Sequence, residues 1–457
     1  MKVVLISTYE LGHQPFGLAS PAAWLREAGA LVTCMDLAVD HIDRAAVAGA
    51  GLIAFYLPMH TATRIAAEFV PRIRAINPQA HLCFFGLYAP LNEPFLRKLG
   101  AGSILGGEFE TGLVSLYRRL AQNGKLSEPE TTAPRISLER QAFRVPDRSH
   151  LPALSNYAFL DMGDGRQRVV GYTEASRGCK HLCRHCPVVP VYQGRFRVVQ
   201  REIVLADIRQ QVAAGADHIT FGDPDFLNGP GHAIPLVKAL HAEFPALTYD
   251  VTCKVEHLLK RPDLLSLLRD TGCLFVTSAV EAVDDAILQI LDKGHTRADF
   301  VQLAGLFRDV GLTLNPTFVA FNPWTTLEGY LDLLNLIAEL DLVGHVSPIQ
   351  YAIRLLIPAG SRLLELPQIQ EMVAEFDEQA LVYPWQHAER QVDRLQAQVL
   401  KAIKAGEAEG MSRREIFSQV WRLAWAMAGQ SHRPAPSLPL NDLVARPIPH
   451  LSEPWYC

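Results

Sequence analysis

The sequence Glu174-Ala-Ser-Arg-Gly-Cys-Lys-His-Leu-Cys-Arg-His-Cys-Pro187 decides the fold class of this chain. It places Cys179, Cys183 and Cys186 on one short loop in the pattern C-x₃-C-x₂-C. Three thiolates at this spacing can hold three irons of a [4Fe–4S] cluster and leave the fourth iron without a protein ligand. An open iron is what an enzyme needs if a small molecule is to bind the cluster directly.

The same loop has a zinc alternative, in which the three cysteines join His181 or His185 in a closed Cys₃His site. Structural zinc modules usually carry two separated ligand pairs, and no second C-x₂-C or H-x₃₋₅-H pair occurs outside this loop. Disulfides are disfavoured because the chain is large, has few cysteines and shows no export signal. The cluster is therefore the favoured interpretation.

Length and composition set the broad class. A chain of 457 residues, 49% hydrophobic and 20% charged, predicts two or three globular domains. The net charge of −5 gives no overall attraction for nucleic acid or for an anionic membrane. Residues 1–6 read as a first strand rather than a signal peptide, and no segment approaches the ~18 apolar residues of a membrane span. We therefore expect a soluble, cytoplasmic protein, which suits an oxygen-sensitive cluster.

Residues 1–120 predict an α/β domain with a parallel, doubly wound, Rossmann-like sheet. Ligands of such sheets bind at the carboxyl ends of the strands, and a G-x-G-x-x-G dinucleotide motif is absent. The expected strands, separated by helices such as 61–76, are 2–7, 31–35, 51–57, 81–85 and 103–105.

The rest of the chain divides into four parts. Residues 121–168 are rich in charge and proline and predict a surface linker. Residues 169–366 alternate strand and helix patterns and predict six β/α units. Residues 367–430 predict helices, and the proline-rich residues 431–457 predict an extended tail. The expected core strands are 169–176, 218–221, 248–253, 274–279, 313–318 and 347–356.

The cysteine spacing, with a strand before it and β/α units after it, resembles the radical SAM superfamily. In that family the open iron chelates S-adenosylmethionine (SAM), and one electron from the cluster cleaves SAM to a 5′-deoxyadenosyl radical. The resemblance implies a partial (β/α)₆ barrel with chemistry at the carboxyl ends of its strands. It also implies an electron donor such as flavodoxin or ferredoxin. The residue before the last cysteine is commonly aromatic in the family, whereas His185 stands there in this chain.

The resemblance also implies SAM-binding residues by position. Gly222 and Asp223 stand where the family binds the amino group of SAM, and the alternative is an acidic turn before a helix. Glu281 follows the fourth strand and is expected to accept hydrogen bonds from the ribose, with a charge at a helix N-terminus as the alternative. Arg297 is the candidate for the carboxylate of SAM. The resemblance identifies no catalytic residue.

The first domain resembles the cobalamin-binding arrangement found before some radical SAM cores. The turn Gly106-Gly-Glu-Phe-Glu-Thr111 resembles the Gly-Glu-x-Glu turn common in that group. The D-x-H-x-x-G motif is missing, so no histidine from that motif is expected on the cobalt, and His13 and His60 are the candidates to lie near it. The alternative is a vestigial domain that shapes the substrate pocket.

The two ends of the chain resemble a more specific family, the radical SAM proteins with a CUAEP or CCAEP tail. The resemblance rests on the opening Ser7-Thr-Tyr-Glu-Leu-Gly-His-Gln-Pro15 and the ending Glu453-Pro-Trp-Tyr-Cys457. In that family a cysteine is followed by selenocysteine or cysteine and then by Ala-Glu-Pro. The hypothesis is that a UGA selenocysteine codon after Cys457 was read as a stop, and the alternative is a natural terminus.

The function expected from these features is radical SAM chemistry, with cobalamin-dependent methyl transfer to an unactivated carbon of an unknown small molecule or peptide. The alternatives are a non-methylating radical SAM enzyme and a non-catalytic zinc or redox protein. A tRNA methylthiotransferase is disfavoured because it needs three N-terminal cysteines, whereas only Cys34 and Cys83 precede the core. It also needs a basic RNA-binding module, which the sequence lacks. Cys253 and Cys273 read as small buried side chains.

Overall fold

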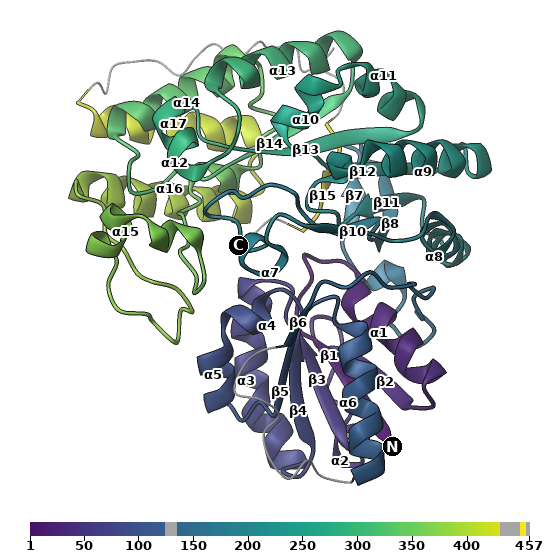
Figure 1. Ribbon diagram of the computed structural model, residues 1–457. Helices are drawn as coiled ribbons and strands as arrows, with labels where there is room; N and C mark the ends of the chain where they lie inside the picture. Colours follow the sequence, from purple (N-terminus) through teal and green to yellow (C-terminus); the bar gives the residue numbers. More distant parts are fainter. Residues whose placement is uncertain (124–134, 430–447, 454–457) are drawn as a thin grey trace.

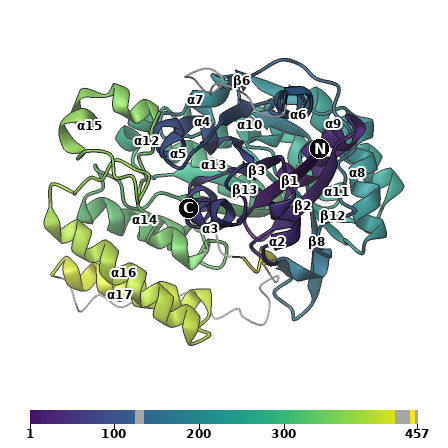
Figure 2. The same ribbon diagram turned by 90° about the horizontal axis from the view of Figure 1, so that it is seen from below.

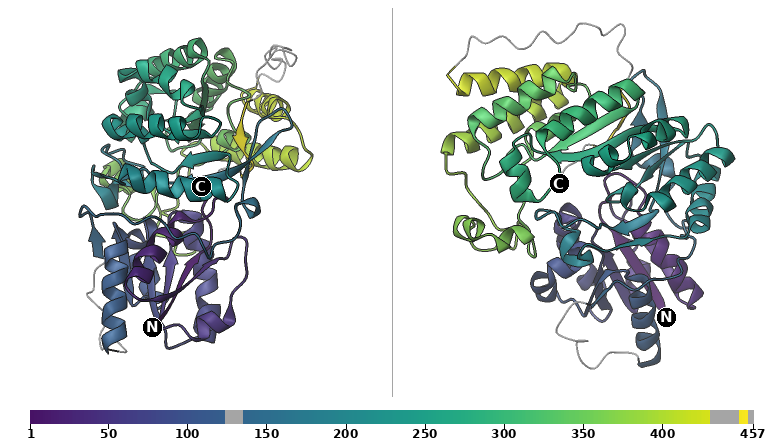
Figure 3. Two further views of the ribbon diagram at one scale, coloured as in Figure 1. Left: turned by 90° about the vertical axis from the view of Figure 1, so that its right-hand side faces the viewer. Right: turned by 45° about the horizontal axis from the view of Figure 1, so that its top comes forward.

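Two β-sheets organise the residues that the computed structural model describes, which are 1–123, 135–429 and 448–453. The first sheet and its helices form the lower part of the molecule in Figure 1, and the second sheet with its helices forms the upper part. The side view in Figure 3 shows the same two tiers. Val188, Val191 and Tyr192, which follow the cysteine loop, pack against the hydrophobic core of the first sheet, so this segment joins the two tiers.

The first sheet has six parallel strands in the order β2-β1-β3-β4-β5-β6. This order reverses direction between β1 and β3, which is the position where doubly wound sheets bind ligands. The strands are β1 (Lys2–Ser7), β2 (Leu31–Asp36), β3 (Leu52–Tyr56), β4 (His81–Phe85), β5 (Ser103–Gly107) and β6 (Arg135–Ser137).

Helices cover both faces of the first sheet because successive strand residues point to opposite sides. Val3 and Leu5 pack with α1 (Phe16–Glu27) and α6 (Glu110–Asn123) on one face. Val4 and Ile6 pack on the other face, where Figure 1 shows α3 and α5. The helices on that side are α2 (Arg44–Ala48), α3 (His60–Ile76), α4 (Tyr88–Leu91) and α5 (Glu93–Lys98). The predicted Rossmann-like sheet is present.

The second sheet is curled and has seven strands in the order β14-β13-β12-β11-β8-β7-β15. Five neighbouring strands are parallel, and β7 and β15 are antiparallel additions at one edge. The parallel strands are β8 (Gln167–Thr173), β11 (His218–Phe221), β12 (Thr248–Thr252), β13 (Cys273–Glu281) and β14 (Thr313–Phe318). All five lie where the sequence predicts strands.

Helices pack on the second sheet and form the largest hydrophobic core of the described residues. Figure 1 shows α10, α11, α13 and α14 above this sheet. The helices of this tier are α8 (Arg201–Ala213), α9 (Pro230–Glu243), α10 (Val255–Lys260), α11 (Asp263–Asp270), α12 (Asp285–Leu291), α13 (Arg297–Val310) and α14 (Leu327–Glu339).

The predicted strand over residues 347–356 is wrong. A 3₁₀ turn, η3 (Pro348–Tyr351), occupies its first half, and only Arg354 forms an isolated parallel bridge, to Phe321. Pro348 has no backbone N–H to donate to a ladder. The Gln350 side chain instead accepts a hydrogen bond of 2.8 Å from the backbone N–H of Phe318 at the end of β14. The Gln350 side chain thus takes up a backbone N–H of β14 that a sixth strand would otherwise bond. The barrel therefore has five parallel strands.

The predicted linker contributes to both sheets, contrary to the expectation of a surface connector. Arg135–Ser137 is β6 of the first sheet, and β7 (Phe159–Asp161) pairs with β8 in the second. Further along the chain, α16 (Arg390–Ala408) and α17 (Arg413–Met427) lie side by side, as Figure 2 shows, after the short α15 (Pro367–Met372). These agree with the predicted C-terminal helices.

The end of the chain returns to the second sheet. The short β15 (His450–Leu451) pairs with β7, and Glu453 accepts a hydrogen bond of 2.8 Å from Tyr9 in the first tier. Cys457 and most of the proline-rich tail lie outside the described residues, so the hypothesis about a selenocysteine codon stays a prediction. Among the described residues, no helix combines the length and the apolar character that crossing a membrane requires.

Candidate active site at the cysteine loop

The cysteine loop follows β9 (Ser176–Gly178) and leads into the short helix α7 (Val189–Tyr192), after which β10 (Phe196–Val198) returns and pairs antiparallel with β9. Gly178 has φ of +76°, and a Cβ atom there would lie 2.3 Å from the Tyr192 ring. Only glycine fits at such a position. The turn at Gly178 therefore directs the chain from the hairpin into the loop.

The loop brings the three predicted cluster ligands together. Cys183 is buried and Cys179 and Cys186 are half-buried, and none of them forms a disulfide. Burial, together with the neighbouring Cys183 and Cys179, raises the pKa of the Cys186 thiol to about 12. This mutual effect means that three thiols share one small volume. Three thiolates so close together would repel one another if no cation were bound. The irons of a cluster, which bind thiolates, would offset this repulsion.

Buried lysines supply positive charge beside the thiols. Lys254 Nζ lies 3.6 Å from Cys183 Sγ, and Lys293 is 4% exposed and lowers the pKa of Cys186. Asn228 Oδ1 accepts a hydrogen bond from the backbone N–H of Lys180 at 3.3 Å and lies 3.7 Å from Cys179 Sγ. Sequence reasoning missed Lys254 and Asn228, because each is a single residue far from the loop in sequence and carries no spacing signal. The segment Lys293-Gly-His-Thr296 resembles the one that often follows the ribose-binding carboxylate in the family, but the sequence assigns Lys293 no role.

The histidines of the loop have partners other than the thiols, which disfavours the Cys₃His zinc alternative. His185 Nε2 lies 3.0 Å from Glu281 Oε1, and His181 Nε2 lies 3.0 Å from His257 Nε2. A closed zinc site would need one of these imidazoles as its fourth ligand. The geometry therefore fits a site with three thiolate ligands.

Glu281 lies beside the loop, as predicted, at the end of β13. Its carboxylate contacts His185 and lies 3.3 Å from Lys293 Nζ. Burial alone would raise the pKa of Glu281, but the Lys293 ammonium and His185 lower it to about 2. Glu281 also has φ of +70°, in the left-handed region that a non-glycine residue rarely adopts. The carboxylate is therefore ionised and fixed, while its contact with ribose stays a prediction.

Gly222 and Asp223 lie at the end of β11, next to the segment that leads into the loop. Asp223 accepts hydrogen bonds from the backbone N–H of Ala175 at 2.9 Å and from the Ser176 hydroxyl. Burial raises the pKa of Asp223 to about 7. The Asp223 side chain thus supports the start of the cysteine segment, while Gly222 lines a cavity. Their contact with the amino group of SAM stays a prediction.

Arg297 has a different environment from the other predicted site residues. It begins α13, and its guanidinium pairs with Asp332 of α14. Its side chain is 35% exposed. The structure does not bring Arg297 into contact with the cysteine loop, and its proposed contact with the SAM carboxylate stays a prediction.

The Gly-Glu-x-Glu turn of the first tier clamps the cysteine segment. Glu110 accepts two hydrogen bonds from Arg177, at 2.7 and 3.0 Å, and Glu108 lies 3.5 Å from the same guanidinium. Glu174 forms a third ion pair with Arg177, and all four side chains are nearly inaccessible to solvent. Paired guanidinium–carboxylate bonds of this kind are short and directional. The turn therefore fixes the first sheet against the residue two positions before Cys179.

A cavity of about 180 Å³ separates the first sheet from the start of the cysteine loop. Glu10 and His13 follow β1, and Tyr56 ends β3, so the cavity lies over the point where the strand order reverses. Glu10 Oε2 and His13 Nδ1 are buried without a hydrogen-bond partner. Gly222 lines the opposite wall. The unpartnered polar atoms indicate a ligand here.

The fit of cobalamin to this cavity is partial. Small-molecule sites usually enclose roughly 300–1,000 Å³, and this cavity of about 180 Å³ is smaller, so a corrin needs more room than the cavity offers. His13 lines the cavity, and its imidazole stacks on Tyr172 at 4.7 Å, while its position near a cobalt stays a prediction. His60 instead bonds the carbonyl of Ala380 at 2.6 Å.

Comparison with known proteins agrees with this geometry. Residues 173–334 match the model of the Radical SAM superfamily, so the middle of the chain is a radical SAM enzyme domain. A hopanoid C-3 methylase of Methylococcus capsulatus is 24% identical over 324 residues, covering 68% of this chain and 62% of the relative. A tRNA-2-methylthio-N(6)-dimethylallyladenosine synthase of Desulfosudis oleivorans is 24% identical, covering 49% of each chain. The chain thus spans about half to three fifths of these curated relatives.

A solved structure shows a similar fold along most of the chain. The cobalamin-dependent SAM radical enzyme OxsB, solved with aqua-cobalamin and SAM bound, superposes with a TM-score of 0.70. It is 15% identical, and the match covers 89% of this chain and 67% of OxsB. At this identity the likeness concerns the fold, in which an α/β domain precedes a curled radical SAM sheet.

Proposed function

We propose that the chain is a radical SAM enzyme that methylates an unactivated carbon of a small molecule or peptide with the help of cobalamin. The observation that carries the proposal is the position of Cys179, Cys183 and Cys186. They lie on one loop between the carboxyl end of a curled parallel sheet and the ligand-binding edge of a doubly wound sheet.

The residues of the loop and its surroundings would hold the reactants. The three thiolates would bind the cluster, and Lys254 and Lys293 would offset their negative charge. When bound and reduced, the cluster supplies the electron that cleaves SAM into methionine and a 5′-deoxyadenosyl radical. A flavodoxin or ferredoxin would provide that electron. Glu281, ionised and held by His185 and Lys293, would accept hydrogen bonds from the ribose.

Cobalamin belongs to the proposal because of the domain order and the unpartnered groups at the edge of the first sheet. Glu10 and His13 are buried and line the cavity beside the start of the cysteine loop, and one atom of each side chain, Glu10 Oε2 and His13 Nδ1, has no hydrogen-bond partner. Methylcobalamin, when bound, carries the methyl group that is transferred. The likeness to OxsB supports the proposal at the level of the fold.

The test separates radical formation from methyl transfer. Protein reconstituted anaerobically with iron and sulfide is incubated with SAM and a reductant, with and without cobalamin, and the products are quantified by mass spectrometry. The proposal predicts 5′-deoxyadenosine together with S-adenosylhomocysteine, the second product depending on cobalamin. Retention of cobalt on the desalted protein gives an independent measure of cobalamin binding.

Other outcomes would point to the alternatives. Deoxyadenosine without S-adenosylhomocysteine, and without bound cobalt, would favour non-methylating radical chemistry. One zinc in place of about four irons would favour the non-catalytic metal protein. The methylthiotransferase alternative is disfavoured further, because Cys34 and Cys83 are buried in β2 and β4 of the first sheet.

A further inference from the structure

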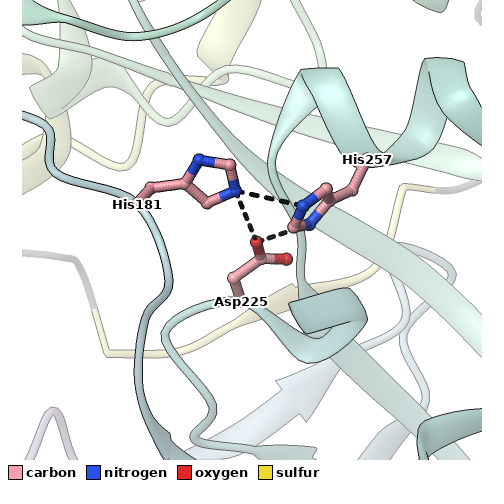
Figure 4. Close-up of side chains that lie close together, drawn as sticks. All are labelled: His181, Asp225 and His257. Atoms are coloured by element: carbon pink, nitrogen blue, oxygen red, sulfur yellow. Dashed lines mark hydrogen bonds and ion pairs between the residues drawn. The ribbon is translucent and has the colours of Figure 1, made fainter. Parts of the chain in front are cut away.

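A second group of potential metal ligands lies beside the cysteine loop. His181 belongs to the loop itself, Asp225 follows β11 and His257 lies on α10. One ligand atom from each side chain can be chosen so that all three lie within 4.8 Å of one another. Figure 4 shows the two imidazoles and the carboxylate directed toward a common point from three different segments. The three predicted cluster ligands are not members of this group.

The three side chains are close enough for their ligand atoms to bind one metal ion. His181 Nε2 lies 3.0 Å from His257 Nε2 and 3.9 Å from Asp225 Oδ2. His257 Nδ1 lies 2.7 Å from the same Asp225 oxygen. Two ligands bound to one metal at about 2.0–2.2 Å are typically separated by such distances. Small rotations of the imidazoles would bring all three groups onto one ion.

Hydrogen bonding within the group does not explain its geometry. Asp225 is 0% exposed and His257 is 7% exposed, yet Asp225 Oδ2 and His257 Nδ1 have no hydrogen-bond partner, although they are only 2.7 Å apart. Their orientation is wrong for an N–H···O bond. Within the described part of the chain, the other oxygen of Asp225 accepts one hydrogen bond, from the backbone N–H of Lys254 at 3.5 Å. A buried carboxylate with so few partners is costly unless a cation offsets it.

Surrounding charges are compatible with a divalent cation. Glu256 Oε2 lies 3.7 Å from His181 Nδ1, the ring nitrogen opposite the one that faces the group. A carboxylate in this position orients a metal-bound imidazole and increases its basicity. The Lys254 ammonium lies 3.9 Å from Glu256 and 3.6 Å from Cys183 Sγ, so it is held by these two partners.

We propose that His181, Asp225 and His257 bind one divalent transition-metal ion, Zn²⁺ or Fe²⁺, next to the cluster loop. Two imidazoles and one carboxylate are a ligand set that both ions accept, with remaining positions open to water. Because His181 lies between Cys179 and Cys183, the ion would tie the cysteine loop to the end of β11 and to α10. The site would thus order the loop independently of the cluster. This inference does not depend on the proposed methyl transfer.

The test uses full-length protein with its cluster reconstituted. Elemental analysis then counts zinc, expected at the proposed site, separately from the iron of the cluster. After incubation with Zn²⁺ and desalting, we expect one zinc per chain in addition to about four irons with sulfide. Zinc X-ray absorption should show only nitrogen and oxygen neighbours, without the sulfur at about 2.3 Å that a cysteine-bound zinc would give.

Variants complete the test. Asp225→Asn keeps the shape of the side chain, and His257→Ala removes an imidazole. Each should weaken zinc binding by more than the roughly 10–100-fold that loss of an outer partner costs, while the iron and sulfide content stays unchanged. His241→Ala, on α9 and outside the group, is the matched control and should bind zinc as the wild type does.

Three results would overturn the site. They are the absence of both zinc and a fifth iron from a protein that holds its cluster, sulfur in the zinc environment, and equal zinc affinity in Asp225→Asn and wild type. Because iron and sulfide are measured on the same samples, failure of the zinc site is distinguishable from failure of the cluster. A folded Asp225→Asn, checked by circular dichroism, keeps the test valid if His257→Ala does not fold.

Discussion

At Gly222, a Cβ atom would lie 2.0 Å from Tyr172 Oη and 2.3 Å from Tyr172 Cζ. We predict that Gly222→Ala destabilises the protein by about 1–3 kcal/mol, because the buried tyrosine must move. Gly305→Ala is the control, since no heavy atom lies within 4 Å of its Cβ position in α13. That change should stabilise the protein by up to about 1 kcal/mol. Urea denaturation measures both, and equal effects would contradict the packing described.

His13 predicts a pH dependence of stability. Burial lowers the pKa of His13 to about 4, below its usual 6.5, and among nearby charges Asp250 raises it and His218 lowers it. On acidification the unfolded chain binds this proton first, so stability is lost as the pH falls from about 6.5 toward 4. Between pH 7 and pH 5 the loss should be about 2 kcal/mol.

The variant His13→Phe keeps an aromatic ring beside Tyr172 and removes this titration. The difference in unfolding free energy between wild type and variant, measured with urea at pH 7 and pH 5, should shift by that amount in favour of the variant. Other buried groups titrate in both proteins and cancel in the difference. A difference that stays constant with pH would contradict the buried, neutral state of His13.

At the residue scale, the sequence predicts the cluster ligands because they are local. Cys179, Cys183 and Cys186 lie within eight residues, and their spacing alone carries the chemistry. Lys254 and Lys293 come from distant segments and have no sequence pattern, so only the fold shows that they lie beside the thiols. Arg297 was predicted from its position along the chain, yet Asp332 is its partner in the structure.

At the scale of elements, the pair between Glu110 of α6 and Arg177 of β9 joins the first sheet to the cysteine segment. We predict that Glu110→Gln costs about 3 kcal/mol of stability, because it leaves a buried guanidinium with one fewer carboxylate. Lys98→Ala is the control. Its pair with Glu378 also joins distant segments but is exposed and should contribute no more than about 1 kcal/mol.

Chemical denaturation of the two variants compares these interactions directly. Glu110→Gln should lower the free energy of unfolding more than Lys98→Ala does. Equal losses would mean that the Gly-Glu-x-Glu turn is not the clamp described above. Its signal in the sequence was its likeness to a cobalamin-group motif, whereas the structure shows that its two glutamates contact Arg177.

The strands of both sheets were predictable where apolar runs were long enough to bury both faces, as in β1 and β4. The short β6 and β7 were missed because each has three residues within a polar, proline-rich segment. Pairing with an existing sheet edge, not local sequence, determines them. The apolar stretch at 347–356 has the pattern of a strand, but Tyr351 and Ala352 within it are buried against α16 and α17 and form no ladder.

At the scale of the whole molecule, the cysteine loop lies where two sheets present their ligand-binding edges to each other. The first sheet contributes the loops after β1 and β3, and the second contributes the ends of β11 and β13. The last described residues return to both tiers, through β15 and through Glu453. Domain order was predictable from sequence, while this opposition of the two edges required the structure.

The central claim is that the three cysteines hold a cluster that cleaves SAM. The most direct test is the yield of 5′-deoxyadenosine from anaerobically reconstituted protein with SAM and a reductant. Cys183→Ala is compared with Cys34→Ala, whose buried thiol in β2 serves as the control. The account predicts product in wild type and Cys34→Ala and none in Cys183→Ala. Equal product from Cys183→Ala, or none from wild type with about four irons bound, would contradict it.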